Sequence, residues 1–217
     1  MSGIEKRAKR VLITVFWFLA FVGSANSPLL GFQDSGNRDT QQGAESAWEF
    51  KDVHGTTHRP FDRQNKNKHK AIVLVFISHD CPIANAFQPE IRSLERKFRS
   101  QNVSFFLIHS NPDLDQETAN QHCKEYEIEA NVVIDSSQEI AKRVNAKVTP
   151  EAFLISAKGK TLYRGRINDL YAGFGKKRSQ PTTHDLRDAI EQHLGGEKIQ
   201  TAETKPIGCF IFFEKKK

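Results

Sequence analysis

The chain has 217 residues, a length that suits one domain with short appendages. It carries 32 Lys and Arg against 26 Asp and Glu, a net charge of +6, and much of this excess lies at the two ends of the chain, in residues 6–10 and 215–217. The nearly neutral body excludes a nucleic-acid-binding protein, whose affinity rests on clustered phosphate contacts. Three Cys are too few for a disulfide scaffold, and 16 Phe can fill a core, which excludes a fully disordered chain.

Residues 1–25 have the three-part pattern of a secretory signal peptide. A basic stretch is followed by an uncharged apolar run at 11–22 and by small residues at 23–25. The run is shorter than the roughly 20 residues of a membrane-spanning helix, so an uncleaved anchor is the alternative. Both interpretations predict an exported body, periplasmic or otherwise extracytoplasmic, where disulfides persist. Residues 26–46 are rich in Ser, Gly, Gln and Asn and predict a flexible linker.

Strands and helices alternate along the next segment, which we assign as the folded domain at 47–195. The first strand is predicted near residues 48–50. Residues 71–77 (AIVLVFI) predict a strand buried on both faces of a sheet. Asp80 can cap the helix that follows, and Pro82 fits its first turn.

The alternation continues to the end of the domain. Further strands are expected at 103–108, 131–134, 152–155 and 161–167, and further helices at 115–126, 137–144 and 182–194. A turn at Lys158-Gly159-Lys160 makes the last two strands a hairpin. This order predicts an α/β fold with a mixed central sheet flanked by helices. Residues 196–217 are expected to form a mobile C-terminal tail that carries Cys209.

The domain resembles the thioredoxin fold, specifically its redoxin or AhpC/TSA-like branch. The buried strand ends at Cys81-Pro82-Ile83-Ala84, where that fold keeps its active cysteine. Val148-Thr149-Pro150 precedes a strand and is similar to the cis-proline loop that faces this cysteine. The hairpin turn at 158–160 and the segment 163–167 resemble the end of the family's sheet. The resemblance covers about residues 48–194 and implies a thioredoxin-like three-layer sandwich.

The sequence also departs from the family's motifs. Ala84 replaces the second cysteine of the thioredoxin Cys-x-x-Cys motif. Leu74 stands where peroxiredoxins have proline, although Ser78 fits the position of their hydroxyl residue. The tail motif Pro206-Ile207-Gly208-Cys209 is similar to Pro-x-Gly-Cys endings that follow the redoxin domain in some exported bacterial proteins of this branch. The motifs therefore describe neither a complete disulfide reductase nor a complete peroxidase.

Cys81 is the predicted catalytic residue. A thiol at a helix N-terminus meets unpaired N–H groups, which favour the thiolate that attacks disulfides and peroxides. His79 would assist as a cation, whereas Asp80 would oppose the thiolate. The resemblance implies that Thr149 and Pro150 shape the site from the opposite side. The alternative is an inert buried cysteine, and the redox assignment requires a Cys81 sulfur that solvent reaches and that lies near residue 150.

A second cysteine must resolve the product formed on Cys81. The three cysteines allow the bridges 81–123, 81–209 and 123–209. We rank 81–209 first, because Cys209 follows a Gly-rich hinge and could swing to Cys81, and 123–209 second. The alternatives are that Cys123 is a helix-face residue without a role and that Cys209 anchors the tail or carries a lipid.

These features predict an exported thiol-dependent oxidoreductase that acts on protein disulfides or peroxides and has an antioxidant role. It would use no cofactor and an external thiol reductant, and it would meet a membrane only through an uncleaved leader. The alternative is a non-catalytic binding module for a partner protein or copper. Thiolate and imidazole suit copper, but the copper chaperones of this fold need a Cys-x-x-x-Cys pair, and position 85 is Asn85. No metal ligands are therefore predicted.

Overall fold

The computed structural model of the chain describes residues 48–62 and 69–213. The leader and the linker predicted for residues 1–25 and 26–46 lie outside the described residues. Among the helices of the described part, none combines the length and the hydrophobicity that a membrane crossing requires.

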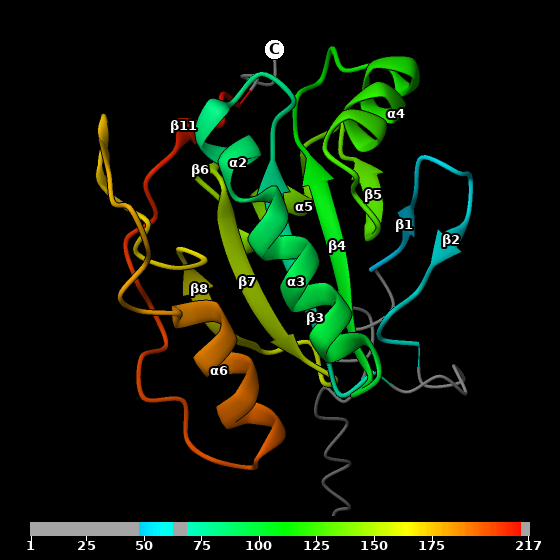
Figure 1. The fold of residues 1–217 in the computed structure, drawn as a ribbon. Coiled ribbons are helices and arrows are strands. Elements are labelled where there is room, and N and C mark those ends of the chain that lie inside the picture. Colours follow the sequence, from blue (N-terminus) through cyan, green and yellow to red (C-terminus); the bar gives the residue numbers. More distant parts are fainter. Residues whose placement is uncertain (1–47, 63–68, 214–217) are drawn as a thin grey trace, which may run out of the picture. The chain divides into compact units, whose positions relative to one another are not determined.

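A five-stranded sheet forms the centre of the described domain (Figure 1). Its strands are β3 (Ala71–Ile77), β4 (Val103–His109), β5 (Asn131–Ile134), β7 (Glu151–Ser156) and β8 (Thr161–Gly165). They lie in the order β5-β4-β3-β7-β8, with β3, β4 and β5 parallel and β7 antiparallel to both of its neighbours. Every residue of β3 is buried. The apolar run therefore marks the central strand, and the predicted mixed sheet is confirmed.

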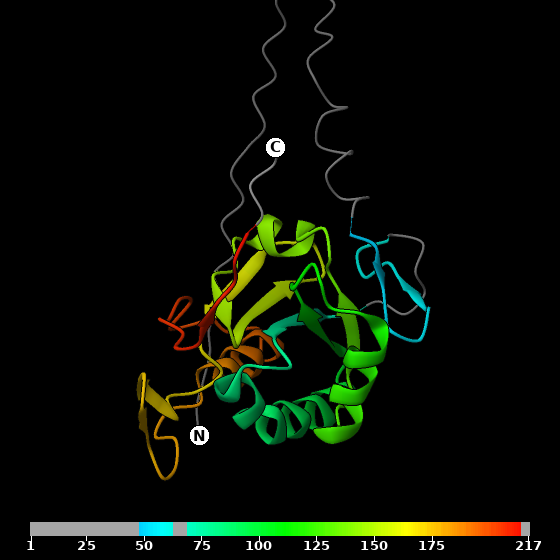
Figure 2. The ribbon, with the colours of Figure 1, turned by 90° about the horizontal axis from the view of Figure 1, so that it is seen from above.

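The residues of β3 alternate between two apolar clusters, one on each face of the sheet. Val73 and Val75 pack in the larger cluster, beneath α3 (Gln88–Arg99), α4 (Gln116–Glu125) and α6 (Asp185–Leu194). Leu74 and Phe76 pack in the smaller cluster, together with Ala141 of α5 (Glu139–Val144). Figure 2 shows the sheet between these helices. The three-layer thioredoxin-like architecture is confirmed.

Short elements complete the domain. They are the hairpin of β1 (Phe50–Lys51) and β2 (Thr57–His58), the single turn α2 (Pro82–Ala86), β6 (Val148–Thr149), the hairpin of β9 (Tyr171–Gly173) and β10 (Lys176–Lys177), and β11 (Cys209–Phe210).

The last helix begins later than its hydrophobic pattern predicts. The backbone N–H groups of Thr182 and Thr183 donate to the Asp169 carboxylate at 2.6 and 2.9 Å. These residues are therefore held in a loop, and α6 begins at Asp185.

Residues 202–213, which we call the C-terminal strap, follow the edge of the domain (Figure 2). The Thr204 N–H donates to the Arg164 carbonyl at 3.0 Å. Further along, β11 pairs antiparallel with β6 and places Cys209 opposite Thr149. The side chain of Gln138 donates to the Phe212 carbonyl at 2.7 Å. The expected mobile tail is thus a hydrogen-bonded segment, because its backbone groups find partners on β8 and β6.

Candidate active site around Cys81 and Cys209

Cys81 lies between β3 and α2, as the sequence predicts. It is the N-cap residue of α2, Pro82 follows in the first turn, and the Ala84 N–H donates to the Cys81 sulfur at 3.4 Å. The buried strand thus fixes the backbone on one side of the cysteine and the helical turn fixes it on the other.

The loop at Thr149 and Pro150 faces Cys81. The peptide bond between these two residues is cis, as the resemblance implies. The Cys81 thiol donates to the Thr149 carbonyl at 3.1 Å. Residue 150 is therefore next to the cysteine, which meets one of the two requirements for the redox assignment.

A buried carboxylate holds this loop from behind. Glu151 is 1% exposed. It accepts a hydrogen bond from the Lys147 N–H at 2.6 Å, and Arg164 binds its other oxygen at 3.1 Å. Our sequence analysis did not identify Glu151, although an acid at the start of an apolar strand is a signal that could have revealed it.

The strap brings Cys209 to the same place. The Cys81 and Cys209 sulfurs are 2.7 Å apart, and both residues are free cysteines. A disulfide has an S–S bond of about 2.05 Å, so the two sulfurs need only a short further approach. The structure thus brings together the pair that we ranked first.

Gly208 allows the strap to lie against the cis-proline loop. A Cβ atom at this position would fall 2.1 Å from the Thr149 carbonyl oxygen and 3.0 Å from the Pro150 nitrogen. A side chain would force the strap away from the loop. The glycine of the Pro-x-Gly-Cys ending therefore has a physical role, which is the close approach that sets Cys209 over Cys81.

The third cysteine takes no part in this arrangement. Cys123 lies on α4, half-buried against the larger apolar cluster, and burial raises its pKa. None of the hydrogen bonds found at Cys81 or Cys209 in the described residues involves it. In Figure 1, α4 and β11 lie on opposite sides of α2. This placement gives no support to the bridges 81–123 and 123–209.

The two paired thiols have pKa values shifted in opposite directions. Burial raises the pKa of Cys81, but hydrogen bonds with the Cys209 thiol, the Thr149 side chain and the Ala84 N–H outweigh it, and the net pKa is lowered. Burial, the hydrogen bond to Cys81 and the negative charges of Cys81 and Asp80 raise the pKa of Cys209 to about 12. Cys81 is therefore the more acidic thiol of the pair, and Cys209 is the one that keeps its proton to higher pH.

The exposure of the pair differs from the sequence-based expectation. Cys81 is only 1% exposed, whereas Cys209 is half-buried. The requirement for a solvent-reachable Cys81 sulfur is therefore not met while the strap is in place. The Cys209 sulfur is one of the groups in direct contact with the Cys81 sulfur, so the pairing itself contributes to the burial of Cys81.

Comparison with known proteins identifies the family of the domain. The family model named Redoxin matches residues 44–170, more than half of the chain. The chain belongs to the Redoxin family. The matched residues of this redoxin include Cys81 and Pro150 but end before the strap, so the family match does not cover Cys209.

Two solved structures have the same fold as this redoxin. A hypothetical protein from Sinorhizobium meliloti 1021 is 24% identical, with a TM-score of 0.66, and the alignment covers 77% of this chain and 91% of that chain. An uncharacterized conserved protein from Geobacillus kaustophilus is 25% identical, with a TM-score of 0.67 and coverages of 78% and 90%. No curated protein matches the redoxin.

The predicted supporting residues contribute unequally. The Ser78 hydroxyl donates to the Asp80 carboxylate, so its proton is engaged there, and this hydrogen bond holds the pKa of Asp80 down. The Nδ1 atom of His79 is buried and has no hydrogen-bond partner among the described residues. Pro82 starts α2.

Across residues 48–62 and 69–213, no three His, Cys, Asp or Glu side chains are grouped so that they could hold a metal ion.

A buried polar chain beneath the site was missed by sequence analysis. The Asn85 side-chain amide donates to the His79 carbonyl at 2.8 Å, and His122 Nε2 lies 2.9 Å from Asn85 Oδ1. Nδ1 of His122 is 3.3 Å from Nε2 of His109. Burial, reinforced by neighbouring histidines, lowers the pKa of His109 to about 3 and that of His122 to about 4.

Both rings are therefore neutral at pH 7, with His122 donating to Asn85 and accepting from His109. This series of hydrogen-bonded side chains connects the loop before Cys81 to α4 and β4. No local sequence pattern marks it, because its members lie far apart along the chain.

Proposed function

We propose that this redoxin is a thiol–disulfide oxidoreductase whose redox pair is Cys81 and Cys209. The observation that carries the proposal is the 2.7 Å separation of the two sulfurs, with a lowered pKa at Cys81 and a raised pKa at Cys209. Cys81 supplies the thiolate. Cys209 takes the place of the second cysteine of the Cys-x-x-Cys motif, which is Ala84 in this chain. Oxidation of the two thiols forms one disulfide and releases two electrons and two protons.

Protein thiols and disulfides are the proposed substrates in place of peroxides. The Ser78 hydroxyl, which would assist a peroxidase, is engaged by Asp80. Leu74 also occupies the position of the peroxidase motif's proline. The proposed place of action is outside the cytoplasm, on the strength of the leader pattern at residues 1–25, because such compartments allow disulfides to persist.

Disulfide mapping tests the redox pair. The purified protein is oxidised with excess hydroxyethyl disulfide, a small uncharged oxidant, and is then digested and analysed by mass spectrometry. We expect a peptide pair joined through Cys81 and Cys209, with Cys123 free. The Cys123→Ser variant is the matched control and should form the same bridge. A bridge between Cys81 and Cys123, or no intramolecular bridge, would contradict the proposal.

Turnover separates this function from the non-catalytic alternative. The Cys81→Ser and Cys209→Ser variants should each lose catalysis of thiol–disulfide exchange in a model protein substrate, while Cys123→Ser retains it. A binding module predicts instead that the wild-type protein has no turnover and that Cys81→Ser still binds its partner.

A further inference from the structure

We propose that a protein dithiol reduces the Cys81–Cys209 disulfide by attacking Cys209, and that it docks on a surface formed by Phe174, Phe210 and Phe212. The inference rests on the proposed function and adds to it the sulfur that meets the partner and the chemistry of that partner.

Accessibility distinguishes the two sulfurs. Cys81 is 1% exposed and lies beneath the strap, whereas Cys209 is half-buried on the strap itself. Thiol–disulfide exchange requires the incoming thiolate to reach the sulfur that it attacks. A protein thiol, which carries its own bulky surroundings, can reach Cys209 with the strap in place, but it can reach Cys81 only after the strap has left.

The direction of bond breaking agrees with this access. Attack on Cys209 expels Cys81, and exchange is faster when the leaving thiol has the lower pKa. The Ala84 N–H donates to the Cys81 sulfur at 3.4 Å whatever the state of Cys209, and this donor stabilises the departing Cys81 thiolate.

The reaction balances in two steps. The partner's first thiolate bonds to the Cys209 sulfur, the Cys81–Cys209 bond breaks, and Cys81 leaves as a thiolate. The partner's second thiolate then attacks the partner sulfur of the mixed disulfide and releases Cys209, which takes up a proton. The partner's two thiols become a disulfide, and two electrons pass to the pair.

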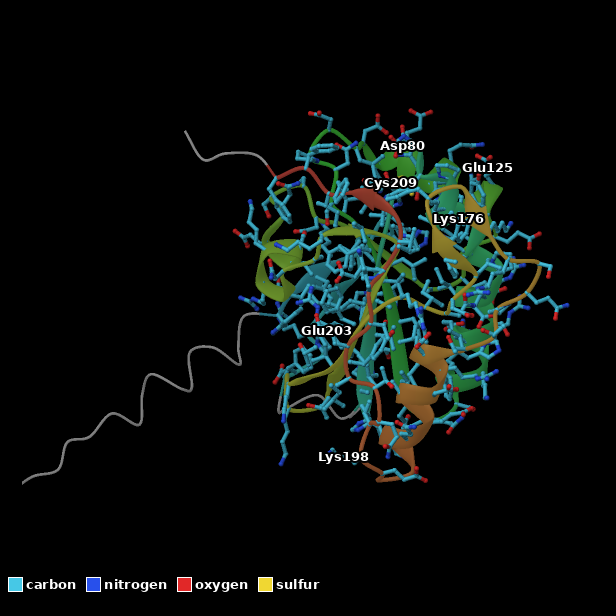
Figure 3. All side chains as sticks on the ribbon, turned by 90° about the vertical axis from the view of Figure 1, so that its left-hand side faces the viewer. Asp80, Glu125, Lys176, Lys198, Glu203 and Cys209 are labelled. Carbon is cyan, nitrogen blue, oxygen red and sulfur yellow. The ribbon has the colours of Figure 1, made fainter. Side chains whose placement is uncertain are left out.

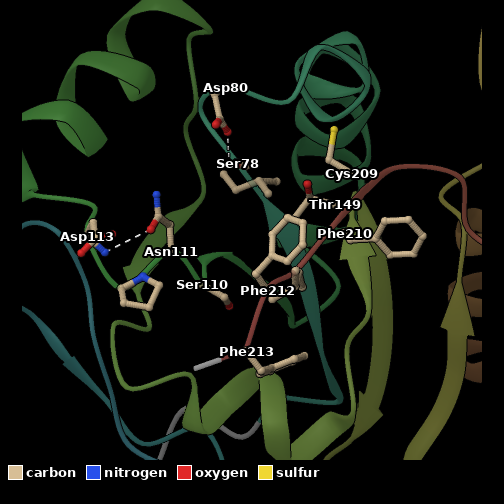
Figure 4. A pocket seen from close by; sticks show the side chains of 13 residues that line it. Ser78, Asp80, Ser110, Asn111, Asp113, Thr149, Cys209, Phe210, Phe212 and Phe213 are labelled. Atoms are coloured by element: carbon tan, nitrogen blue, oxygen red, sulfur yellow. Dashed lines mark hydrogen bonds between the residues drawn. The ribbon is translucent and has the colours of Figure 1, made fainter. Parts of the chain in front are cut away.

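Exposed aromatic side chains gather around the accessible thiol. Among the described residues, the exposed large hydrophobic side chains are Phe174, Phe210 and Phe212, at 62%, 67% and 83%. Phe210 and Phe212 line a cleft of about 420 Å³ together with Cys209 (Figure 4). Phe210 also lines a second cleft, of about 780 Å³, with Phe174 of the β9–β10 hairpin. Figure 3 shows Lys176 of this hairpin and Cys209 on the same face.

Such a surface suits a protein partner more than a small thiol. Exposed apolar patches mark interaction sites, and aromatic residues are enriched in them. The cleft beside Cys209 is lined by the carboxylates of Asp80 and Asp113, and no Lys, Arg or His is among the described residues that line it. An anionic thiol such as glutathione is repelled there, whereas a protein cysteine with neutral or basic surroundings is not.

Trapping identifies the attacked sulfur. The oxidised protein, with its Cys81–Cys209 bridge verified first, is mixed with a bacterial thioredoxin whose second active-site cysteine is replaced by Ser, which stops the reaction at the mixed disulfide. We expect the adduct on Cys209 and alkylation of the released Cys81. An adduct on Cys81 would overturn the inference. If no Cys81–Cys209 bridge forms before the thioredoxin is added, the proposed function itself has failed, and the two failures are thereby distinguished.

Kinetics test the docking surface. In the Phe174→Ser/Phe212→Ser double variant, the rate constant for reduction by wild-type thioredoxin should fall about tenfold. Reduction by dithiothreitol, which needs no docking, should change by less than about twofold. Lys158→Ser, in the exposed turn between β7 and β8, is the control and should change neither rate. Equal changes in both rates, or none, would contradict the proposed surface.

Discussion

The sulfurs of Cys81 and Cys209 are held in place by different kinds of contact. Cys81 follows a strand whose seven residues are all buried between two layers of helices. Cys209 is held by a two-residue pairing with β6, a few backbone hydrogen bonds and the close approach of Gly208. The first region depends on the hydrophobic core and the second on contacts at the edge of the domain. Single substitutions should therefore uncouple the pair without unfolding the domain.

The largest expected effect is at Glu151, which supports the loop that both regions contact. Glu151→Ala leaves the half-buried Arg164 guanidinium and the Lys147 N–H without their buried acceptor, and we expect a loss of about 3 kcal/mol in the free energy of unfolding. Urea denaturation measures it. Glu203→Ala removes the exposed partner of the same arginine and should cost less than about 0.5 kcal/mol. Equal losses in the two variants would refute the role of Glu151.

Removal of the strap should expose the sulfur of Cys81. A chain that ends after Lys205 lacks the segment that lies over Cys81. The alkylation rate of Cys81 by iodoacetamide should rise about tenfold, because the gain in access outweighs the loss of the Cys209 hydrogen bond that lowers the Cys81 pKa. Mass spectrometry of the labelled peptides measures the rate. Cys123 serves as the internal control, since it packs against the larger apolar cluster, whereas Ile211 and Phe213 of the strap pack against the smaller one. An unchanged Cys81 rate would show that the strap does not protect the sulfur.

A methyl group at Gly208 should weaken the pair while leaving the strap present. The Cβ of Gly208→Ala would meet the Thr149 carbonyl, and overpacking of this kind costs about 1–3 kcal/mol. We expect the equilibrium constant for forming the Cys81–Cys209 disulfide against glutathione to fall about tenfold. Gly173→Ala is the control, because its nearest neighbour would be the Lys176 side chain at 3.8 Å. A normal equilibrium constant in Gly208→Ala would contradict the close approach.

A pH dependence of stability is expected from the buried histidines His109 and His122. The pKa values of His109 and His122 are about 3 and 4 when folded, against about 6.5 when unfolded. As the pH falls from 6.5 to 4, the unfolded chain therefore binds more protons than the folded one. Stability should fall by about 1.4 kcal/mol per pH unit for each histidine.

The substitution His122→Gln removes one of these contributions, so the slope of the unfolding free energy against pH should become shallower by about 1.4 kcal/mol per pH unit. Denaturant unfolding at several pH values measures the slope. His54→Gln, at an exposed position, is the control and should leave it unchanged. A wild-type slope in His122→Gln would show that the buried histidine does not couple folding to protonation.

The sequence by itself determined the scaffold and the place of the first cysteine. The apolar run at 71–77 is shielded from water only between two layers of helices, and the helices that cover it show their own periodicity. The presence of a mixed parallel and antiparallel sheet therefore followed from local patterns. Cys81 beside Pro82 at the end of that strand, and Thr149-Pro150 before another, were recognisable as motifs. Local patterns work here because burial and helix capping act on residues close together in the chain.

Tertiary structure alone decided how the site is completed. Cys209 lies 128 residues from Cys81, and its approach depends on the strap's register on β6 and on Gly208 fitting over the Thr149 carbonyl. The support from Glu151 and the chain of His109, His122 and Asn85 likewise join distant segments. Such contacts are set by the shape and packing of the folded chain, which no local periodicity encodes, and they place the buried Cys81 sulfur directly beneath Cys209.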